Sequence, residues 1–234
     1  MLQRLPYLRA DQRARGRDGG GHLARIARGS HLPPRLSFPD QYAGLVSEAP
    51  LVKAASGLVP TDDGWFVVNA ADAAWVVNPD FGARCSFEAN GPALRENPEL
   101  APHLFPQLGF RLHVLEPGKP SGLYHAESGQ EDFLVLAGEC LLLIEEEERP
   151  LHAWDFVHCP PGTRHVFVGT DEPCVLLMTG ARSQEGTIVY PRSEAAARHG
   201  ASVEEETDSP HEAYASHPHW QPGDPGRPLP GMRA

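Results

Sequence analysis

Long apolar runs and paired cysteines are missing from this chain of 234 residues. No segment approaches the roughly twenty consecutive apolar residues that a membrane-spanning helix needs, and no charged segment leads into an apolar one as in a secretory leader. The four cysteines form no Cys-x-x-Cys pair, which argues against a four-cysteine zinc site and for buried, reduced thiols. These absences predict a soluble, cytoplasmic protein without a membrane partner.

Positive charge is also scarce, because 20 basic residues against 31 acidic ones leave a formal net charge of −11. Binding to a phosphate backbone needs a basic face, so we expect no nucleic-acid partner. The helix-turn-helix pattern of many DNA-binding proteins is absent from the sequence as well. The basic residues that do occur are unevenly placed, since residues 1–36 hold eight arginines and only two aspartates.

Residues 1–44 form a basic arm without sustained apolar periodicity, and it includes three consecutive glycines at 19–21. This composition predicts a disordered arm, which we leave out of the fold argument. Two alternatives stay open. The arm is also rich in arginine and poor in acid, as organelle-targeting peptides are, although it has little serine. A start codon assigned too early would equally explain it.

Strand-length runs dominate the middle of the chain. Six of them lie in roughly seventy residues and are separated by Gly, Pro or charged turns, with no amphipathic segment of helix length between them. This spacing predicts an all-β fold, a small antiparallel β-barrel over residues 107–182. The predicted strands are Phe110–Glu116, Phe133–Ala137, Glu139–Ile144, Ala153–His158, His165–Val168 and Val175–Thr179. The acidic run Glu145–Glu148, with Arg149 and Pro150, predicts a solvated hairpin tip.

The flanking segments are predicted to be extensions of this barrel. Residues 45–106 are predicted to form an N-terminal β extension that packs on the barrel. Within it, residues 89–106 are predicted to be a connecting loop with one helical turn near Pro98–Leu100. The predicted strands of the extension are Gly64–Val68, Ala74–Val77 and Ala83–Phe87. Residues 183–234 form a polar tail with a short helix at Ser193–His199, which Ser193 can cap. The tail either covers the barrel through Tyr214 and Trp220 or is disordered.

Four side chains in two short clusters carry the chemistry. His125, Glu127 and Glu131 precede or begin an apolar strand, and His165 follows about one hairpin later in the run Pro160-Pro-Gly-Thr-Arg-His. Residues two apart on an extended strand share a face, so His125 and Glu127 can point into one cavity. Imidazole and carboxylate groups bind divalent metals of intermediate or hard character. The pattern predicts a metal site with room for water or substrate.

The oxygen-rich ligand set favours iron or manganese as the single divalent ion, with zinc or nickel as alternatives. Without a metal, two carboxylates in an apolar cavity repel, and at least one should be protonated. In a metal-free barrel, His125 and His165 would instead be buried polar residues whose hydrogen bonds are made within the protein. Glu127 is either a ligand or a residue of the cavity rim. His113 and His158 are predicted to have surface or interface roles rather than ligand roles.

These residues resemble the two signature motifs of the cupin superfamily over about residues 107–180. The first motif is matched by Gly118, His125-Ala-Glu127, Glu131 and Gly138, and the second by Trp154-Asp155, Pro160-Pro-Gly162-Thr-Arg-His165 and Gly169. Three positions depart from the family pattern. Glu127 takes the place of the second histidine, Trp154 that of a glycine and Gly169 that of an asparagine. The resemblance implies a double-stranded β-helix, or jelly roll, of the cupin type-2 kind, and a homodimer.

Two classes of function fit these observations. The first is a metal-binding enzyme, an oxygenase or an isomerase, that acts on a small organic molecule inside the barrel. In that reading Glu127 is a fourth ligand or a proton-transfer base, and no other catalytic residue is assigned. The second is a non-catalytic module that binds or senses a small ligand. Both classes share a small-molecule partner.

Overall fold

The computed structural model describes residues 46–182 and 186–226 of the chain. The predicted basic arm, residues 1–44, lies outside the described residues. Over the described ranges, no helix is long and apolar enough to cross a membrane. Every statement below concerns the unit that begins at Val46.

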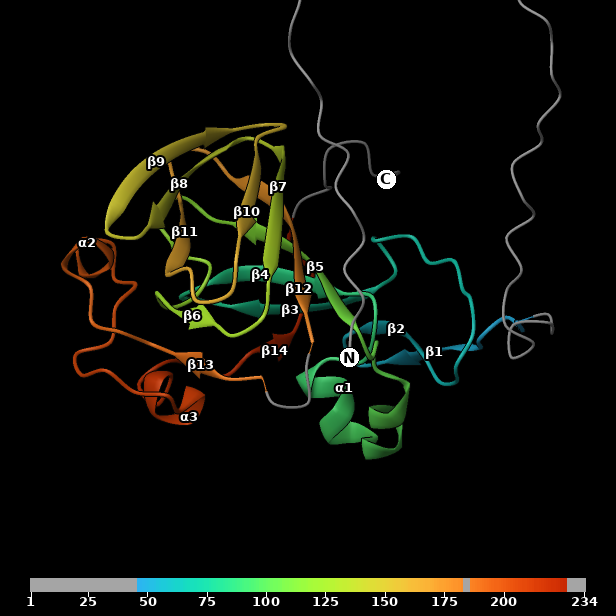
Figure 1. The fold of residues 1–234 in the computed structure, drawn as a ribbon. Coiled ribbons are helices and arrows are strands. Elements are labelled where there is room, and N and C mark those ends of the chain that lie inside the picture. The colour runs from blue at the N-terminus through green and yellow to red at the C-terminus, as the bar shows by residue number, and fades with distance from the viewer. Residues whose placement is uncertain (1–45, 183–185, 227–234) are drawn as a thin grey trace, which may run out of the picture. The chain divides into compact units, whose positions relative to one another are not determined.

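Two antiparallel sheets make up most of this unit (Figure 1). The larger has the strand order β10-β7-β12-β5-β4-β3-β14, and the smaller has the order β11-β8-β9. The strands of the larger sheet are β3 (Ala74–Asn78), β4 (Gly82–Ser86), β5 (Leu108–Leu115), β7 (Glu131–Ala137), β10 (Phe156–Cys159), β12 (Cys174–Ala181) and β14 (Gln221–Pro222). Those of the smaller sheet are β8 (Glu139–Ile144), β9 (Glu147–His152) and β11 (His165–Gly169).

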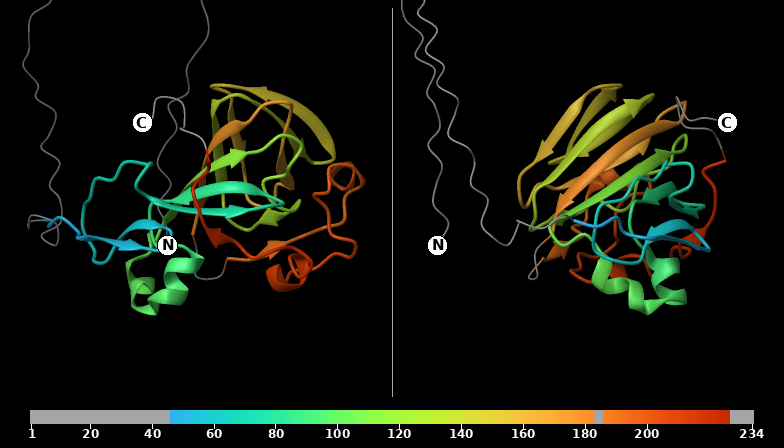
Figure 2. Two further views of the ribbon diagram at one scale, coloured as in Figure 1. Left: turned by 180° about the vertical axis from the view of Figure 1, so that it is seen from behind. Right: turned by 90° about the vertical axis from the view of Figure 1, so that its right-hand side faces the viewer.

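The main apolar core lies between the two sheets, which Figure 2 shows stacked as layers in its right-hand view. Leu115, Phe133 and Leu176 from the larger sheet pack with Leu142 and Phe167 from the smaller one, and all five are buried. Burial of this apolar area is the main source of stability for such a fold. The architecture is the predicted all-β jelly roll.

The N-terminal extension covers the outer face of the larger sheet. Trp75 and Cys85 form one row with Leu112 of β5, and Val114 packs in the same buried cluster. The second half of β5, residues 112–115, is therefore buried on both faces, and successive side chains there alternate between them. A hairpin of β1 (Leu51–Ala54) and β2 (Gly57–Pro60) precedes these strands.

Several predictions for the extension were wrong. Residues 64–68 form no strand and make a single bridge, between Trp65 and Glu48. Helix α1 (Gly91–Glu96) lies in the predicted loop at 89–106, whereas the 3₁₀ helix η2 (Pro98–His103) lies where one helical turn was predicted. The side chain of Asn90 accepts a hydrogen bond from Ala93 N at 3.2 Å and so caps α1. This helix is too short to show an apolar period in the sequence.

The segment after the barrel folds against it through aromatic residues, as one of the two alternatives for the tail required. Strand β13 (Ile188–Val189) pairs with β6 (Ala126–Glu127), and helices α2 (Glu194–Ala197) and α3 (Pro210–Ala213) follow. Ser193 caps α2 through its side chain. Tyr214 and Trp220 both pack against Phe81, with ring centroids 5.5 and 6.3 Å apart. Both residues also line a cavity together with residues of the barrel.

The acidic hairpin is shorter at its tip than predicted. Only Glu145 and Glu146 form the turn, both with positive φ, and strand β9 begins at Glu147. Pro150 lies inside β9, which is an edge strand whose outer side has no partner strand among the described residues. Proline is tolerated there because the hydrogen bond that it cannot donate is not needed on an open edge. The prediction took charge and proline as turn signals when they mark an edge strand.

Trp154 carries backbone strain that can be measured. Its φ is +76°, in the left-handed region, at the position where the motif has a glycine, and its side chain is 75% exposed. The left-handed conformation costs a residue with a Cβ about 1 kcal/mol. Trp154→Gly should therefore raise the free energy of unfolding by about 1 kcal/mol in urea titrations.

Trp154→Ala is the matched control, because it removes the same side chain and keeps the Cβ. It should give at most half of the gain seen with glycine. Equal stabilities of the Gly and Ala variants would show that the turn stores no strain.

Candidate metal centre

His125 and His165 face each other across a short antiparallel bridge. His165 N donates to His125 O at 2.8 Å, and His125 N donates to His165 O at 3.2 Å. Directly opposed residues of an antiparallel pair project their side chains to the same face. The two imidazole rings accordingly lie with their centroids 4.9 Å apart.

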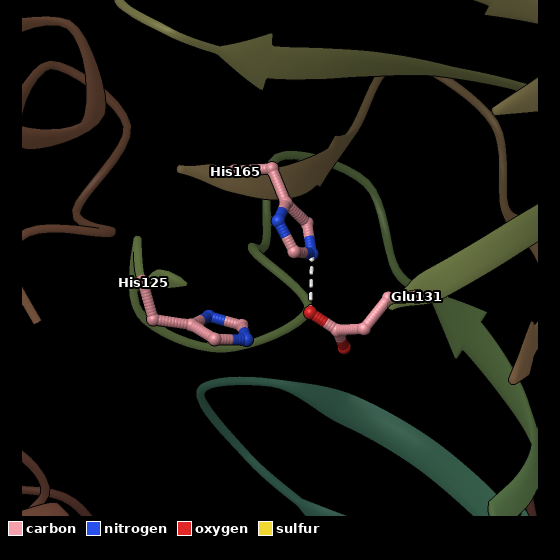
Figure 3. A group of neighbouring side chains, drawn as sticks. All are labelled: His125, Glu131 and His165. Atoms are coloured by element: carbon pink, nitrogen blue, oxygen red, sulfur yellow. Dashed lines mark ion pairs between the residues drawn. The ribbon is translucent and has the colours of Figure 1, made fainter. Parts of the chain in front are cut away.

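Glu131 is the first residue of β7 and meets the two histidines from the larger sheet (Figure 3). Its Oε2 lies 3.6 Å from Nε2 of His165. One ligand atom from each of the three residues lies within 4.8 Å of the others. Ligands on one side of an ion, with bonds of about 2.0–2.2 Å, lie about 3 Å apart, so side-chain rotations must bring the three atoms closer before they can bind one ion.

Glu127, the fourth predicted ligand, stands apart from this group of three. Its Oε1 lies 3.9 Å from Nε2 of His125. Its carbonyl oxygen accepts a hydrogen bond from Gly162 N at 2.8 Å, and Gly162 has φ +85°. Glycine adopts this left-handed conformation without strain. The turn before His165 is thus tied to the strand that carries Glu127.

Hydrogen bonds to carbonyl groups determine which nitrogen of each ring is free. Nδ1 of His125 bonds Leu123 O at 2.7 Å, and Nδ1 of His165 bonds Thr163 O at 3.1 Å. A carbonyl oxygen can only accept, so each Nδ1 carries a hydrogen atom. In the neutral ring the lone pair is then on Nε2, which is the atom that faces Glu131.

Burial keeps the rings of His125 and His165 neutral and makes ionisation of Glu131 unfavourable. Desolvation lowers the pKa of His165 to about 3, with the neighbouring His125 adding to the shift, and burial also lowers the pKa of His125. Burial, followed by the charge of Glu127, raises the pKa of Glu131 to about 8. Two imidazole lone pairs and the carboxyl group of Glu131 therefore converge, and the raised pKa agrees with the expectation that a carboxyl group here is protonated in the absence of metal. This donor set fits a divalent metal ion.

The three residues open into a cavity of about 780 Å³. Phe133 and Phe167 form its apolar wall beside His165, with ring centroids 5.0 and 6.1 Å from that imidazole. Tyr190 approaches His125 at 5.9 Å from the other side. A cavity of this size can hold a small organic molecule next to the three ligand atoms.

A family model described as a cupin domain matches residues 111–180. This segment is a cupin domain. It contains both histidines, both carboxylates and the turn at Gly162. The match confirms the resemblance read from the two motifs.

A search of solved structures found proteins that are similar over part of the chain. A candidate sugar phosphate isomerase of Acidithiobacillus ferrooxidans is 24% identical, with a TM-score of 0.36 over 46% of this chain and 64% of its own. A sugar phosphate isomerase of Silicibacter pomeroyi is 22% identical, with a TM-score of 0.42 over 70% and 96%. A cupin 2 conserved barrel domain protein of Salinispora arenicola is 26% identical, with a TM-score of 0.31 over 40% and 70%.

The chain spans less than two thirds of the length of the first of these structures. With TM-scores below 0.5, none of the likenesses bears on the activity of this cupin. A comparison with curated proteins found no match.

Several residues that line the cupin cavity were missed by the sequence argument. Leu112 and Val114 of β5 are buried in the core, whereas Arg111 and His113 of the same strand line the cavity. His113 is buried, against the prediction of a surface role, and its Nε2 donates to Phe81 O at 2.7 Å. The available signal was a polar residue at every second position of an apolar strand. His158 does lie at the surface, 2.6 Å from Asp132.

The two glutamates of the cupin motif should respond differently to removal of their charge. Glu131→Gln deletes an anionic ligand, so we expect at least about a 100-fold loss of affinity for Mn²⁺ or Fe²⁺, more than loss of an outer-shell partner costs. Glu127→Gln should weaken binding by about tenfold or less. Equilibrium dialysis followed by elemental analysis measures both.

Glu139→Gln is the control, because Glu139 is an exposed carboxylate outside the cavity. Its metal affinity should equal that of the unmodified protein. Equal losses in the Glu127 and Glu131 variants would instead make Glu127 a fourth ligand, and unchanged affinity in the Glu131 variant would contradict the three-residue site.

Proposed function

We propose that this protein is a metal-dependent enzyme that acts on a small organic molecule in the cupin cavity, with His125, Glu131 and His165 as the metal ligands. The observation that carries the proposal is the convergence of two neutral Nε2 atoms and one carboxylate at the wall of a cavity of about 780 Å³. Iron and manganese suit this mixed nitrogen and oxygen ligand set.

The reaction class that this ligand set favours is oxygenation. Two histidines and one carboxylate on one side of an ion leave coordination positions open, and such an ion can activate O₂ and polarise a substrate oxygen. The protein residues have complementary tasks. Phe133 and Phe167 exclude water from one side of the site, and the Nδ1 hydrogen bonds hold both rings in position.

Glu127 supports a second candidate reaction, isomerisation. Its carboxylate lies next to His125 but outside the group of three, where it can take a proton from one substrate carbon and return it to another. The cavity wall on this side includes the hydroxyl-bearing residues Tyr190 and Tyr214. An isomerase would use the same cavity and the same three ligands.

Nitric oxide tests the oxygenase candidate before a substrate is known, because it binds ferrous iron at the open positions that O₂ would use. Protein loaded anaerobically with Fe²⁺ should give the electron paramagnetic resonance signal of a ferrous nitrosyl. His165→Ala should abolish this signal, whereas the surface variant His158→Ala should retain it.

Stoichiometric Fe²⁺ without any nitrosyl signal would rule out oxygenation and leave the isomerase. Failure to bind any divalent metal would contradict the proposal and favour the non-catalytic binding module. The homodimer stays a prediction that light scattering can test.

A further inference from the structure

Two arginines share the cavity with the three proposed metal ligands, on the inner face of the larger sheet. Arg84 of β4 is paired with His113 of β5, and Arg111 precedes His113 by two positions. Paired residues and residues two apart share a face, so the two arginines are diagonal neighbours, about 7–8 Å apart at the backbone. Both line the cavity.

Among the described residues, the side chain of Arg111 makes no hydrogen bond and no ion pair. The contrast is Arg182 in the same cavity. Arg182 Nη1 donates to Glu88 Oε2 at 2.9 Å and also to Phe105 O, and its Nη2 contacts Glu88 Oε1. The charge of Arg182 is therefore compensated by Glu88, whereas that of Arg111 is not compensated by direct contact.

Arg111 is an exposed side chain that lines the cavity, and desolvation lowers its pKa. Arg84 lies with its guanidinium carbon 3.9 Å from the ring centroid of Trp220. Burial, and then repulsion from Arg111, lowers the pKa of Arg84 to about 9. At neutral pH both groups are cations, held close enough to repel each other, and an anion between them would relieve that cost.

The carboxylates of the cavity leave this positive charge in excess once a metal is bound. Glu88 is engaged by Arg182, and the charges of Glu127 and Glu131 together equal that of one divalent ion. The two guanidinium charges then remain. This local excess opposes the formal charge of the whole chain, which is −11. A cavity with this balance selects anionic molecules.

Arg111 also lies near enough to the metal ligands to act on them. Its charge partly offsets the rise in the pKa of Glu131 that burial causes, and it adds to the lowering of the pKa of His125 by burial. If Arg111 binds an anionic group of the substrate, the remainder of the substrate lies beside the proposed metal ligands. The planar guanidinium fork matches two oxygen atoms of a carboxylate or a phosphate.

We propose that Arg84 and Arg111 form an oxyanion-binding subsite that holds a carboxylate or phosphate group of the substrate next to the metal centre. This subsite rests on the proposed function, because the reaction is placed at the metal ligands. It adds the substrate class to that function. Trp220 positions Arg84 by lying against its guanidinium group. The substrate class is therefore a small organic anion.

Succinate and inorganic phosphate are the probes, added separately to Mn²⁺-loaded and to metal-free protein at constant ionic strength. At least one should raise the melting temperature with a saturable dependence on concentration. Arg111→Gln and Arg84→Gln should each weaken that anion at least about tenfold, which is the loss expected for one charge-assisted pair. The preferred probe identifies the oxyanion as carboxylate or phosphate.

Arg149→Gln removes an exposed arginine outside the cavity and should leave the affinity unchanged. Arg111→Lys keeps the charge without the fork and should give an intermediate affinity, which tests the subsite even if the glutamine variants fold poorly. The proposal is overturned if neither anion binds the unmodified protein, or if the Arg111 and Arg84 variants bind as well as the Arg149 variant.

A variant of a metal ligand distinguishes failure of the subsite from failure of the proposed function. Glu131→Gln should still bind the anion while it loses metal. Anion binding in a protein that takes up no metal would leave the subsite standing and contradict the enzyme. Metal uptake without anion binding would leave the enzyme standing and contradict the subsite.

Discussion

The two backbone hydrogen bonds between His125 and His165 are the interaction on which the site depends. They join residues that are forty positions apart in the sequence, and they fix both rings on one face before any ligand is present. Each ring is then oriented by a carbonyl oxygen two residues earlier in the chain. Neutral lone pairs are therefore directed at Glu131 by the backbone itself, which is how preorganised metal sites are built.

Because the site is buried, its charged groups need opposite charges close by. An ionised carboxylate in an apolar cavity is costly unless a cation or hydrogen bonds compensate it, and Glu131 has its pKa raised for that reason. Arg111 presents the opposite case a short distance away, a guanidinium without a direct partner among the described residues. A metal ion at one end and an anionic substrate at the other would compensate both groups.

The sequence was sufficient to predict the barrel and three convergent residues, because motif spacing and strand alternation are local signals. His125, Glu131 and His165 were identifiable from residue type and from the turn at Gly162. The inward face of β5 was not, because apolar residues on that strand pack under the N-terminal extension and so lie on the outer face. Local periodicity cannot show that both faces of a strand are buried.

Strand β9 shows a second limit of the same kind. Its charged residues and Pro150 are permitted by its place at the edge of the smaller sheet, and sheet order depends on long-range pairing. Glu127 shows a third limit. Its spacing from His125 is right for a ligand, yet its carboxylate stands apart from the three converging groups. Spacing along a strand predicts which face of the strand a side chain lies on. It does not predict how close the end of that side chain comes to other groups.

Anomalous X-ray diffraction from crystals of protein purified with its own metal tests the central claim most directly. Data collected on either side of the absorption edges of iron and manganese should give one strong peak bonded to Nε2 of His125, Nε2 of His165 and a carboxylate oxygen of Glu131, at about 2.0–2.2 Å from each. A fully ordered site without an anomalous peak, or a peak bonded to other residues, would contradict the account.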